Sequence, residues 1–337
     1  MSLALALVGL SATLDSLLAV APAAAAGSGA SGRTNALRTL APVRAGASVV
    51  GGVPASIVQF PFQVALYDPS ASSPAMGFFC GGVIVDATHV ATAAHCVAGS
   101  QPDHVAVQAG STSLAPEAGS LRDPVRSISV DSHYSQESSD FDVALLTLAA
   151  PLWSGPAPAA NGSNRIAPVV LDRALASRFG NPNASTPVNA TASGWGDVSP
   201  SPGPAPSYPP YLRSVRLPLV ADATCEEQYS LIEQPITPTM ICAGGGRAHP
   251  DTCYGDSGGP LLVDQDRPAR PPADYVLIGL VDFGNGCAQP GFAGVYTRVA
   301  DREVMGFLLS GIGRGPSSVA AQAKHKKKRK KRHRRHG

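Results

Sequence analysis

A serine flanked by glycines lies in the segment DTCYGDSGGP, residues 251–260. A serine hydroxyl becomes a nucleophile when a neighbouring base takes its proton, and that base is usually a histidine oriented by a carboxylate. Acyl transfer also needs backbone N–H groups directed at the developing oxyanion, and glycines let a backbone turn tightly enough to present them. The segment therefore predicts a nucleophile, Ser257, and an oxyanion hole made by the N–H groups of Gly255 and Ser257. An ordinary Gly/Ser turn is the alternative for this segment taken alone.

Two further segments offer the base and the carboxylate. His95 lies in TAAHC after a strand-like run, where a buried structural histidine is the simpler interpretation of that residue alone. The segment SSDFDVALLTL places Asp142 directly before an apolar strand, with Asp140 as a competitor two residues earlier. An acid before a strand is normally a solvated loop end, so the three segments must be judged together.

The elements that would position these residues are mostly short strands. Gly, Pro, Ser and Asn clusters separate the strand-like runs, which is typical of an all-β sandwich or barrel, and the pattern does not choose between the two. One helix is expected near the end, capped by Asp301, with Val304, Phe307 and Leu308 on one face. The strand-like runs are 62–67, 82–85, 105–110, 143–148, 276–283 and 294–299.

Cysteine content and the chain's amino-terminal segment both point to export. Residues 1–26 end in small residues like a signal peptide, although a basic n-region is missing and Asp15 interrupts the apolar run. A transmembrane helix fits less well because that run is short. Six cysteines in an exported chain predict three disulfides, with 15 possible pairings. The spacings contain no common zinc pattern, so neither a metal nor a cofactor is expected.

Charge is divided unevenly along the chain. The chain has 26 Lys and Arg against 24 Asp and Glu, but ten of the basic residues lie in the last 14 positions. The remainder carries 16 basic and 24 acidic residues, a net charge of −8, and contains no lysine. The tail is too charged to fold. It is predicted either to be simply solvated or to attach to a polyanion such as a cell-wall polymer or an acidic surface.

Together, TAAHC, DVALL and GDSGGP closely resemble the signatures of the trypsin-like (chymotrypsin-fold) serine proteases, in the same order. The resemblance runs from about Val49 to about Leu309 and favours a bacterial secreted member. It implies two six-stranded antiparallel β-barrels with the site between them. It also implies three disulfides: Cys80–Cys96, Cys225–Cys242 and Cys253–Cys287. Further matching segments are VVGG (49–52), CGGVIV (80–85), SGWG (193–196), ITPTMICAG (236–244), GNGCA (284–288) and GVYTRV (294–299).

The resemblance assigns roles to residues of the site. It implies that His95 is the general base and then the general acid, that Asp142, not Asp140, orients it, and that Ser257 attacks the scissile carbonyl. It places Asp251 at the floor of the pocket for the side chain on the acyl side of the cut bond. Gly284 and Gly294 match the glycines that keep the walls of that pocket open, so cleavage after Arg or Lys is expected.

Asp256 and Asp282 raise two questions about this chain. The resemblance implies that Asp256 pairs with the amine released by a cut before Val49, yet Ser48 stands where the family usually has Arg or Lys. Trypsin-like self-activation at that bond is therefore not expected. Asp282 and Phe283 replace a usual Ser-Trp pair. A carboxylate at 282 would lie near Asp142, and like charges in a closed site raise a pKa.

The resulting prediction is a secreted, extracellular serine endopeptidase that cuts protein or peptide substrates after Arg or Lys and acts as a monomer. The alternatives are a catalytically silent binding protein on the same fold and a tail-dominated surface adhesin. The predicted organisation is a signal peptide (1–26), a pro-segment or linker (27–48), a protease domain (49–312) and a disordered basic tail (313–337).

Overall fold

The computed structural model describes residues 52–159, 164–198, 207–245, 251–264 and 275–313. All of them belong to the larger of the two compact units of the chain, Gly46–Gly337. The expected signal peptide and pro-segment, Val49, and the basic tail after Gly313 lie outside the described residues. Within the described part, no helix is long and apolar enough to cross a membrane.

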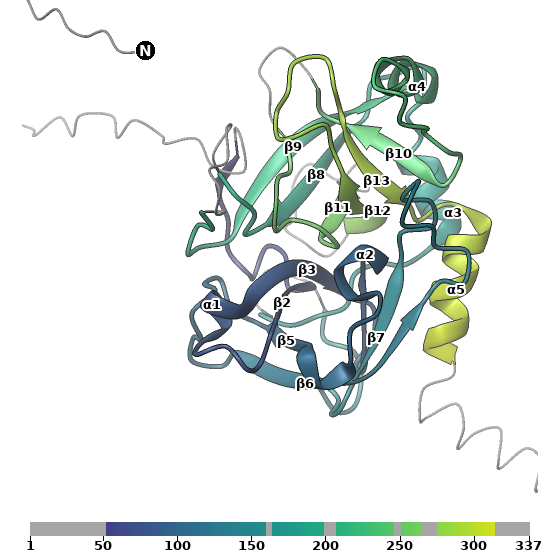
Figure 1. The fold of residues 1–337 in the computed structure, drawn as a ribbon. Coiled ribbons are helices and arrows are strands. Elements are labelled where there is room, and N and C mark those ends of the chain that lie inside the picture. Colours follow the sequence, from purple (N-terminus) through teal and green to yellow (C-terminus); the bar gives the residue numbers. More distant parts are fainter. Residues whose placement is uncertain (1–51, 160–163, 199–206, 246–250, 265–274, 314–337) are drawn as a thin grey trace, which may run out of the picture. The chain divides into compact units, whose positions relative to one another are not determined.

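The first half of the described chain forms a closed six-stranded antiparallel barrel (Figure 1). The strand order around it is β2-β3-β4-β7-β6-β5, and pairing of β5 with β2 closes the circle. Its strands are β2 (Gln63–Tyr67), β3 (Phe78–Ile84), β4 (His89–Thr92), β5 (Ala106–Ala109), β6 (Leu121–Val130) and β7 (Ala144–Leu148).

The second half forms another closed antiparallel barrel, in the order β9-β10-β13-β12-β11-β8, which pairing of β8 with β9 completes. A two-residue strand, β1 (Val53–Pro54), adds to β9 from outside. The barrel strands are β8 (Asn189–Gly194), β9 (Arg213–Val220), β10 (Met240–Ala243), β11 (Pro260–Asp264), β12 (Tyr275–Phe283) and β13 (Gly294–Arg298). The predicted fold of two six-stranded barrels is confirmed, and the sandwich alternative is wrong.

Apolar side chains from alternate strand positions fill each barrel. In β6 and β9 buried and exposed residues alternate over part of the strand, as a strand with one face toward the core requires. In β2 all five residues are buried, and so are seven consecutive residues of β12, because both strands have neighbours on each face. Burial of these apolar faces is the main stabilising contribution to each barrel.

Helices occupy the connections between strands and the carboxyl end. The predicted helix is α5 (Arg302–Gly313), where Asp301 Oδ1 accepts from the N–H groups of Glu303 and Val304. The sequence did not predict four other short helices and one 3₁₀ turn. These are α1 (Pro74–Gly77), α2 (Ala94–Val97), the 3₁₀ turn at Pro102–His104, α3 (Arg173–Phe179) and α4 (Asp222–Ser230).

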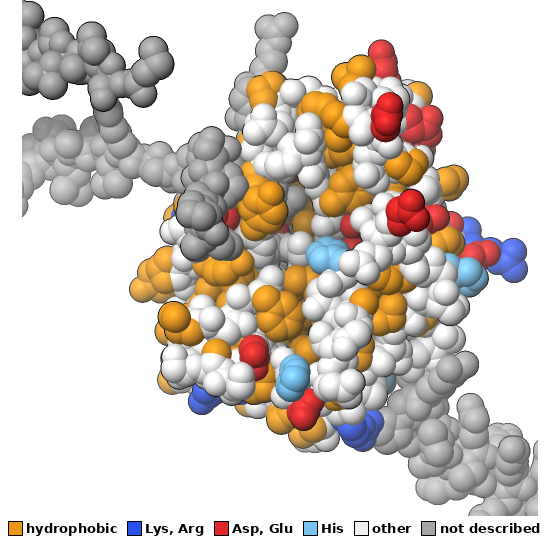
Figure 2. Space-filling model, viewed as in Figure 1, with side chains coloured by type: hydrophobic (Ala, Val, Ile, Leu, Met, Phe, Trp, Pro, Cys, Tyr) orange, Lys and Arg blue, Asp and Glu red, His pale blue; other side chains and the backbone are white. Residues whose placement is uncertain are grey.

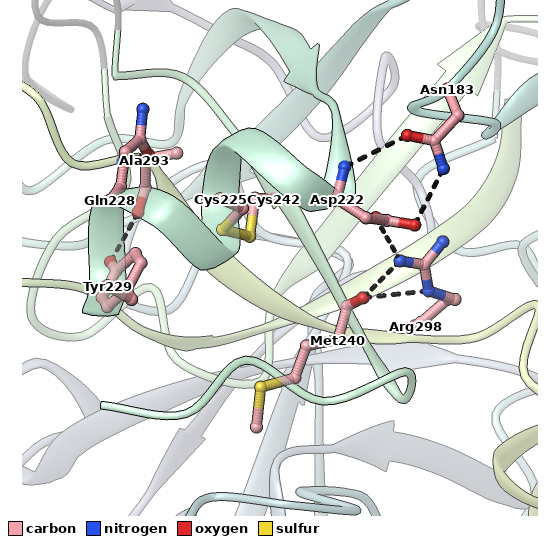
Figure 3. The surroundings of a disulfide bond; sticks show 9 residues. All are labelled: Asn183, Asp222, Cys225, Gln228, Tyr229, Met240, Cys242, Ala293 and Arg298. Atoms are coloured by element: carbon pink, nitrogen blue, oxygen red, sulfur yellow. Dashed lines mark hydrogen bonds and ion pairs between the residues drawn. A yellow bond between two sulfur atoms is a disulfide. The ribbon is translucent and has the colours of Figure 1, made fainter. Parts of the chain in front are cut away.

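The described residues contain three disulfides, and they join the cysteines that the resemblance pairs: Cys80–Cys96, Cys225–Cys242 and Cys253–Cys287. The second fixes α4 to β10 (Figure 3). On one side of this disulfide the Arg298 guanidinium binds Asp222 at 2.6 Å and the Met240 carbonyl. On the other side, α4 reaches the segment before β13 through Tyr229.

Figure 3 shows how Tyr229 of α4 holds that segment. The Tyr229 hydroxyl donates to the Ala293 carbonyl at 2.6 Å, and its ring packs edge-on against Phe283 and Phe292. Gln228 accepts a hydrogen bond from the Ala293 N–H at 3.1 Å. Helix α4 therefore supports the backbone on both sides of Ala293, next to Gly294.

Candidate active site

His95 and Asp142 form a short hydrogen-bonded pair. His95 Nδ1 lies 2.6 Å from Asp142 Oδ2, and the backbone N–H of His95 donates to Asp142 Oδ1 at 2.7 Å. His95 follows β4 in the short helix α2, and Asp142 precedes β7, which pairs with β4 so that Thr92 opposes Ala144. The antiparallel register thus brings the end of one strand to the start of the other.

Burial differs sharply within this pair. The Asp142 side chain is fully buried, whereas 34% of the His95 side chain is exposed. The other ring nitrogen, Nε2, lies 3.7 Å from Cys96 Sγ, a disulfide sulfur with no proton to donate. A ring that donates from Nδ1 to a buried carboxylate keeps Nε2 as the basic nitrogen, which is the arrangement a general base requires.

Asp140, the competing carboxylate, is directed elsewhere. Its Oδ1 accepts hydrogen bonds from the hydroxyls of Thr237, at 2.8 Å, and Thr239. Its backbone pairs with Ser135 in an isolated bridge. The contacts of Asp140 therefore secure a loop, and the structure brings Asp142 rather than Asp140 to His95.

Ser257 and His95 line one cavity of about 370 Å³. Figure 2 shows hydrophobic side chains gathered about the middle of this face, next to a histidine. The Ser257 carbonyl accepts from Gly81 of β3 at 2.8 Å, and the Gly258 N–H donates to Val281 of β12 at 2.8 Å. The serine loop is thus tied to a strand of each barrel. Among the described residues no hydrogen bond joins the Ser257 hydroxyl to His95.

The backbone around Ser257 presents unpaired donors. In the described part of the chain, neither the Gly255 N–H nor the Ser257 N–H donates a hydrogen bond. Gly255 has φ +93°, and a Cβ there would lie 2.6 Å from a ring carbon of Tyr208. Only glycine meets both conditions, so the backbone can take this conformation at Gly255, directly before Asp256 and Ser257.

Asp251 is a buried acid behind the cavity lining. It is 5% exposed, and its carboxylate accepts from the N–H groups of Thr252 and Ala288, each at 2.8 Å. Burial raises the pKa of Asp251 to about 7. Gly284 lines the cavity, whereas Asp251 and Gly294 do not. A Cβ on Gly294 would lie 2.8 Å from Asp251 Oδ1, so a glycine there avoids a clash with the carboxylate.

Asp256, the acid beside Ser257, is buried, and no cation pairs with it among the described residues. Its two oxygens accept from the Gly196 N–H at 2.8 Å and the Cys253 N–H at 3.0 Å. Burial raises the pKa of Asp256 to about 6. The loop that carries Ser257 therefore contains a destabilised carboxylate in the described structure, and Val49, the predicted partner, lies outside the described residues.

Asp282 lies at an irregularity of β12. The register between β12 and β13 shifts between Val281 and Phe283, so Asp282 has no partner across the pair. The residue is 5% exposed and lines the cavity. Burial and the Asp142 charge raise its pKa well above the usual range of an aspartate. The predicted approach of this acid to Asp142 is therefore present.

Sequence reasoning missed several residues around the cavity. Tyr254 and Ser139 also line it, and the Tyr254 side chain is 55% exposed. Tyr208 and Phe78 meet edge-on, with ring centroids 4.9 Å apart, beside Gly255. An exposed aromatic between a cysteine and a glycine was a usable signal for Tyr254. Tyr208 lies in a proline-rich stretch without a strand or helix pattern, so the sequence gives no signal for its place beside Gly255.

Comparison with known proteins identifies the family. The Trypsin family model matches residues 49–304. Trypsin of Saccharopolyspora erythraea is 34% identical over 74% of this chain and 93% of its own length. Trypsin-1 of Astacus astacus is 32% identical over 75% of this chain and 95% of its own. The vitellin-degrading protease of Bombyx mori is 33% identical over 75% and 81%. This chain therefore belongs to the trypsin family and is a serine endopeptidase.

Proposed function

We propose that this endopeptidase is secreted and cuts peptide bonds after Arg or Lys through a His95–Asp142–Ser257 triad and an acyl-enzyme. The observation that carries the triad is the 2.6 Å contact between buried Asp142 and His95 on the rim of the cavity that Ser257 also lines. In the described part of the chain the N–H groups of Gly255 and Ser257 donate no hydrogen bond, which supports an oxyanion hole next to the cavity that Ser257 lines.

In the proposed reaction Ser257 Oγ attacks the scissile carbonyl while His95 Nε2 takes its proton. The carbonyl oxygen gains negative charge, and the Gly255 and Ser257 N–H groups donate to it. His95 then gives the proton to the leaving amine, which leaves Ser257 acylated. Water repeats the sequence and releases the acid. Asp142 accepts from Nδ1 throughout, which fixes the tautomer and stabilises the charged imidazole.

The proposed preference for Arg and Lys rests on Asp251. Among the described residues this carboxylate is 5% exposed and accepts from two backbone N–H groups without a cation, and its burial raises its pKa to about 7. A substrate guanidinium or ammonium that reaches it would relieve the cost of burial, whereas a neutral side chain would not. Gly284 lines the cavity and a Cβ on Gly294 would crowd Asp251, so both glycines are proposed to keep the approach to Asp251 open.

Asp256 supports a proposed activation by cleavage before Val49. A new amine at Val49 would supply the cation that this fully buried carboxylate lacks. Since Ser48 precedes the bond, we propose that a protease with a preference for small residues makes the cut. The proposed mature enzyme domain is 49–312, after a signal peptide at 1–26 and a pro-segment at 27–48.

Three disulfides support the proposal of an extracellular location, because disulfides persist in oxidising compartments. The basic segment 313–337 is proposed to attach the enzyme to a polyanion such as a cell-wall polymer or acidic surface. A monomer suffices for the proposed reaction. Deleting residues 314–337 should leave hydrolysis of a small arginyl ester unchanged and abolish salt-sensitive retention on an anionic matrix.

The test of the function compares Ser257→Ala, His95→Ala and the parent chain, each made with Val49 as its first residue. Arginyl and phenylalanyl amide substrates report specificity, and a fluorophosphonate reports the activated serine. We expect one adduct on Ser257, loss of the adduct in both variants, and preference for arginine. An active parent that prefers phenylalanine would refute the specificity alone. A folded parent without adduct or turnover would refute the triad.

A further inference from the structure

The Asp282 carboxyl group receives no hydrogen bond, from any residue that the structure describes, that could stabilise a negative charge. Both of its oxygens are buried and accept no hydrogen bond. The pair register shifts at this residue, and such a bulge redirects a side chain. Its side chain enters the site of His95 and Asp142, and one nitrogen or oxygen atom from each of the three residues lies within 4.8 Å of the others. A buried, unpaired carboxylate at such a place would destabilise the folded protein.

The groups around Asp282 supply no positive charge that would stabilise its ionised form. Asp142 and Asp140 are both acids, and both raise the pKa of Asp282. Tyr134 and Tyr229 lie near it as well, and since burial is the main cause that raises the pKa of each phenol, neither supplies a positive charge. Among the described residues no arginine pairs with Asp282, and the chain has no lysine before position 324. A single proton is the remaining way to make this cluster stable.

The donors around Asp142 decide which acid holds that proton. Asp142 accepts from the backbone N–H and the ring Nδ1 of His95, two bonds that favour its ionised form. Asp282 accepts none among the described residues, although an oxygen of Asp142 lies within 4.8 Å of one of its own. Asp142 is therefore the ionised acid. Asp282 is the acid that holds the proton, and its O–H group can donate a hydrogen bond.

We propose that Asp282 is a neutral carboxylic acid that donates a hydrogen bond to Asp142 and thereby positions the carboxylate that orients His95. The two acids then share one proton and carry one negative charge. When His95 takes the Ser257 proton, this single charge balances the imidazolium. The proposal rests on the proposed triad, and it makes Asp282 a positioning residue rather than a catalytic one.

The first test uses a pair of variants with matched shape. Asp282→Asn keeps a neutral donor, and Asp282→Leu removes it. We expect the Asn enzyme to retain kcat within about threefold and to keep the acid limb of its kcat/KM profile. We expect the Leu enzyme to lose about tenfold in kcat with KM unchanged, as one hydrogen bond to a charged group predicts. A purely structural role would not distinguish these variants at equal stability.

An ionised Asp282 would give a different pH profile. If Asp282 were ionised in the working range, Asp282→Asn would remove a charge about 5 Å from the imidazole. At an effective dielectric constant of about 20, the acid limb would then move down by about 2 pH units. A shift of that size overturns the proposal, and so does equal activity of the Asn and Leu enzymes.

The second test does not depend on activity. Infrared difference spectra of ¹³C-aspartate-labelled protein should show the C=O stretch of a protonated carboxylic acid at pH 8, absent from Asp282→Asn. At that pH Asp251 and Asp256, with pKa values of about 7 and 6, are mostly ionised. The band should persist in Ser257→Ala. Its presence in an inactive parent would refute the triad and not the proton, whereas its absence would overturn the proton.

Discussion

Cleavage before Val49 should stabilise the protein measurably, because it would supply a cation to Asp256. Burial raises the pKa of Asp256 from 3.8 to about 6. A shift of about 2 units corresponds to roughly 3 kcal/mol of folding free energy. An acid whose pKa is raised by folding holds its proton more tightly in the native state. Stability therefore falls as pH rises from about 4 to about 6 and stays lower above that range.

An amine that pairs with Asp256 removes this penalty. At pH 7 the processed chain should be more stable than its precursor by about 3 kcal/mol, or roughly 5–10 °C in Tm for a domain of this size. The chain for this measurement carries Ser257→Ala and a foreign protease site ending directly before Val49. The same chain before and after the cut is followed by thermal and denaturant unfolding between pH 4 and pH 8.

Asp256→Asn supplies the control. In that background the cut should change Tm by less than about 2 °C, because a neutral amide gains little from an amine. The difference between cut and uncut chains should also vanish near pH 4, where Asp256 is protonated in the precursor. Equal Tm values for the cut and uncut parent at pH 7 would refute the reasoning, and so would a gain that survives in Asp256→Asn.

Three further outcomes are expected. Asp251→Asn should lower kcat/KM for arginyl amides by about 10²–10³-fold and leave phenylalanyl esters within a few fold, since a buried charge pair loses one partner; an equal loss on both substrates would contradict the role of Asp251. Gly255→Ala should lower kcat about 10²-fold with a smaller change in KM, because the added Cβ meets Tyr208 and disturbs the oxyanion donors. Gly119→Ala, which also has positive φ but open space at Cβ, should remain active. Tyr229→Phe should cost about 1 kcal/mol in urea unfolding by removing the bond to Ala293; the exposed Tyr211→Phe should cost nothing measurable, and equal effects would contradict the role of α4.

Much of the strand content was predictable because the inner strands are continuous apolar runs. Strands β2, β5, β7 and β13 fall within runs that the sequence indicates, and β12 begins one residue before its run. Strands β6 and β9 were not predicted, since each contains a proline and charged residues on its exposed face. Closure into barrels depends on pairings between distant strands, such as β8 with β9, and no local pattern reports those.

The predictable parts of the site are those whose positions depend on one short, continuous segment of sequence. The choice of Asp142 over Asp140 came from resemblance, and the structure supplies its physical reason, because threonine hydroxyls hold Asp140 away. The lack of a cation at Asp256 and the lack of donors at Asp282 depend on residues far away in sequence. Likewise, the aromatic pair of Tyr208 and Phe78 is formed by segments about 130 positions apart, so neither segment alone predicts the contact.

The closed pairing of both sheets has a consequence for how the protein behaves at high concentration. Exposed strand edges are templates for the addition of foreign strands and for fibril growth. Every strand of the two barrels has neighbours on both sides among the described strands. The outermost strand, β1, is two residues long and ends in Pro54, which offers no N–H to a further strand. An enzyme with this topology should stay dispersed at high concentration, even while it is surrounded by the extended peptides that it produces.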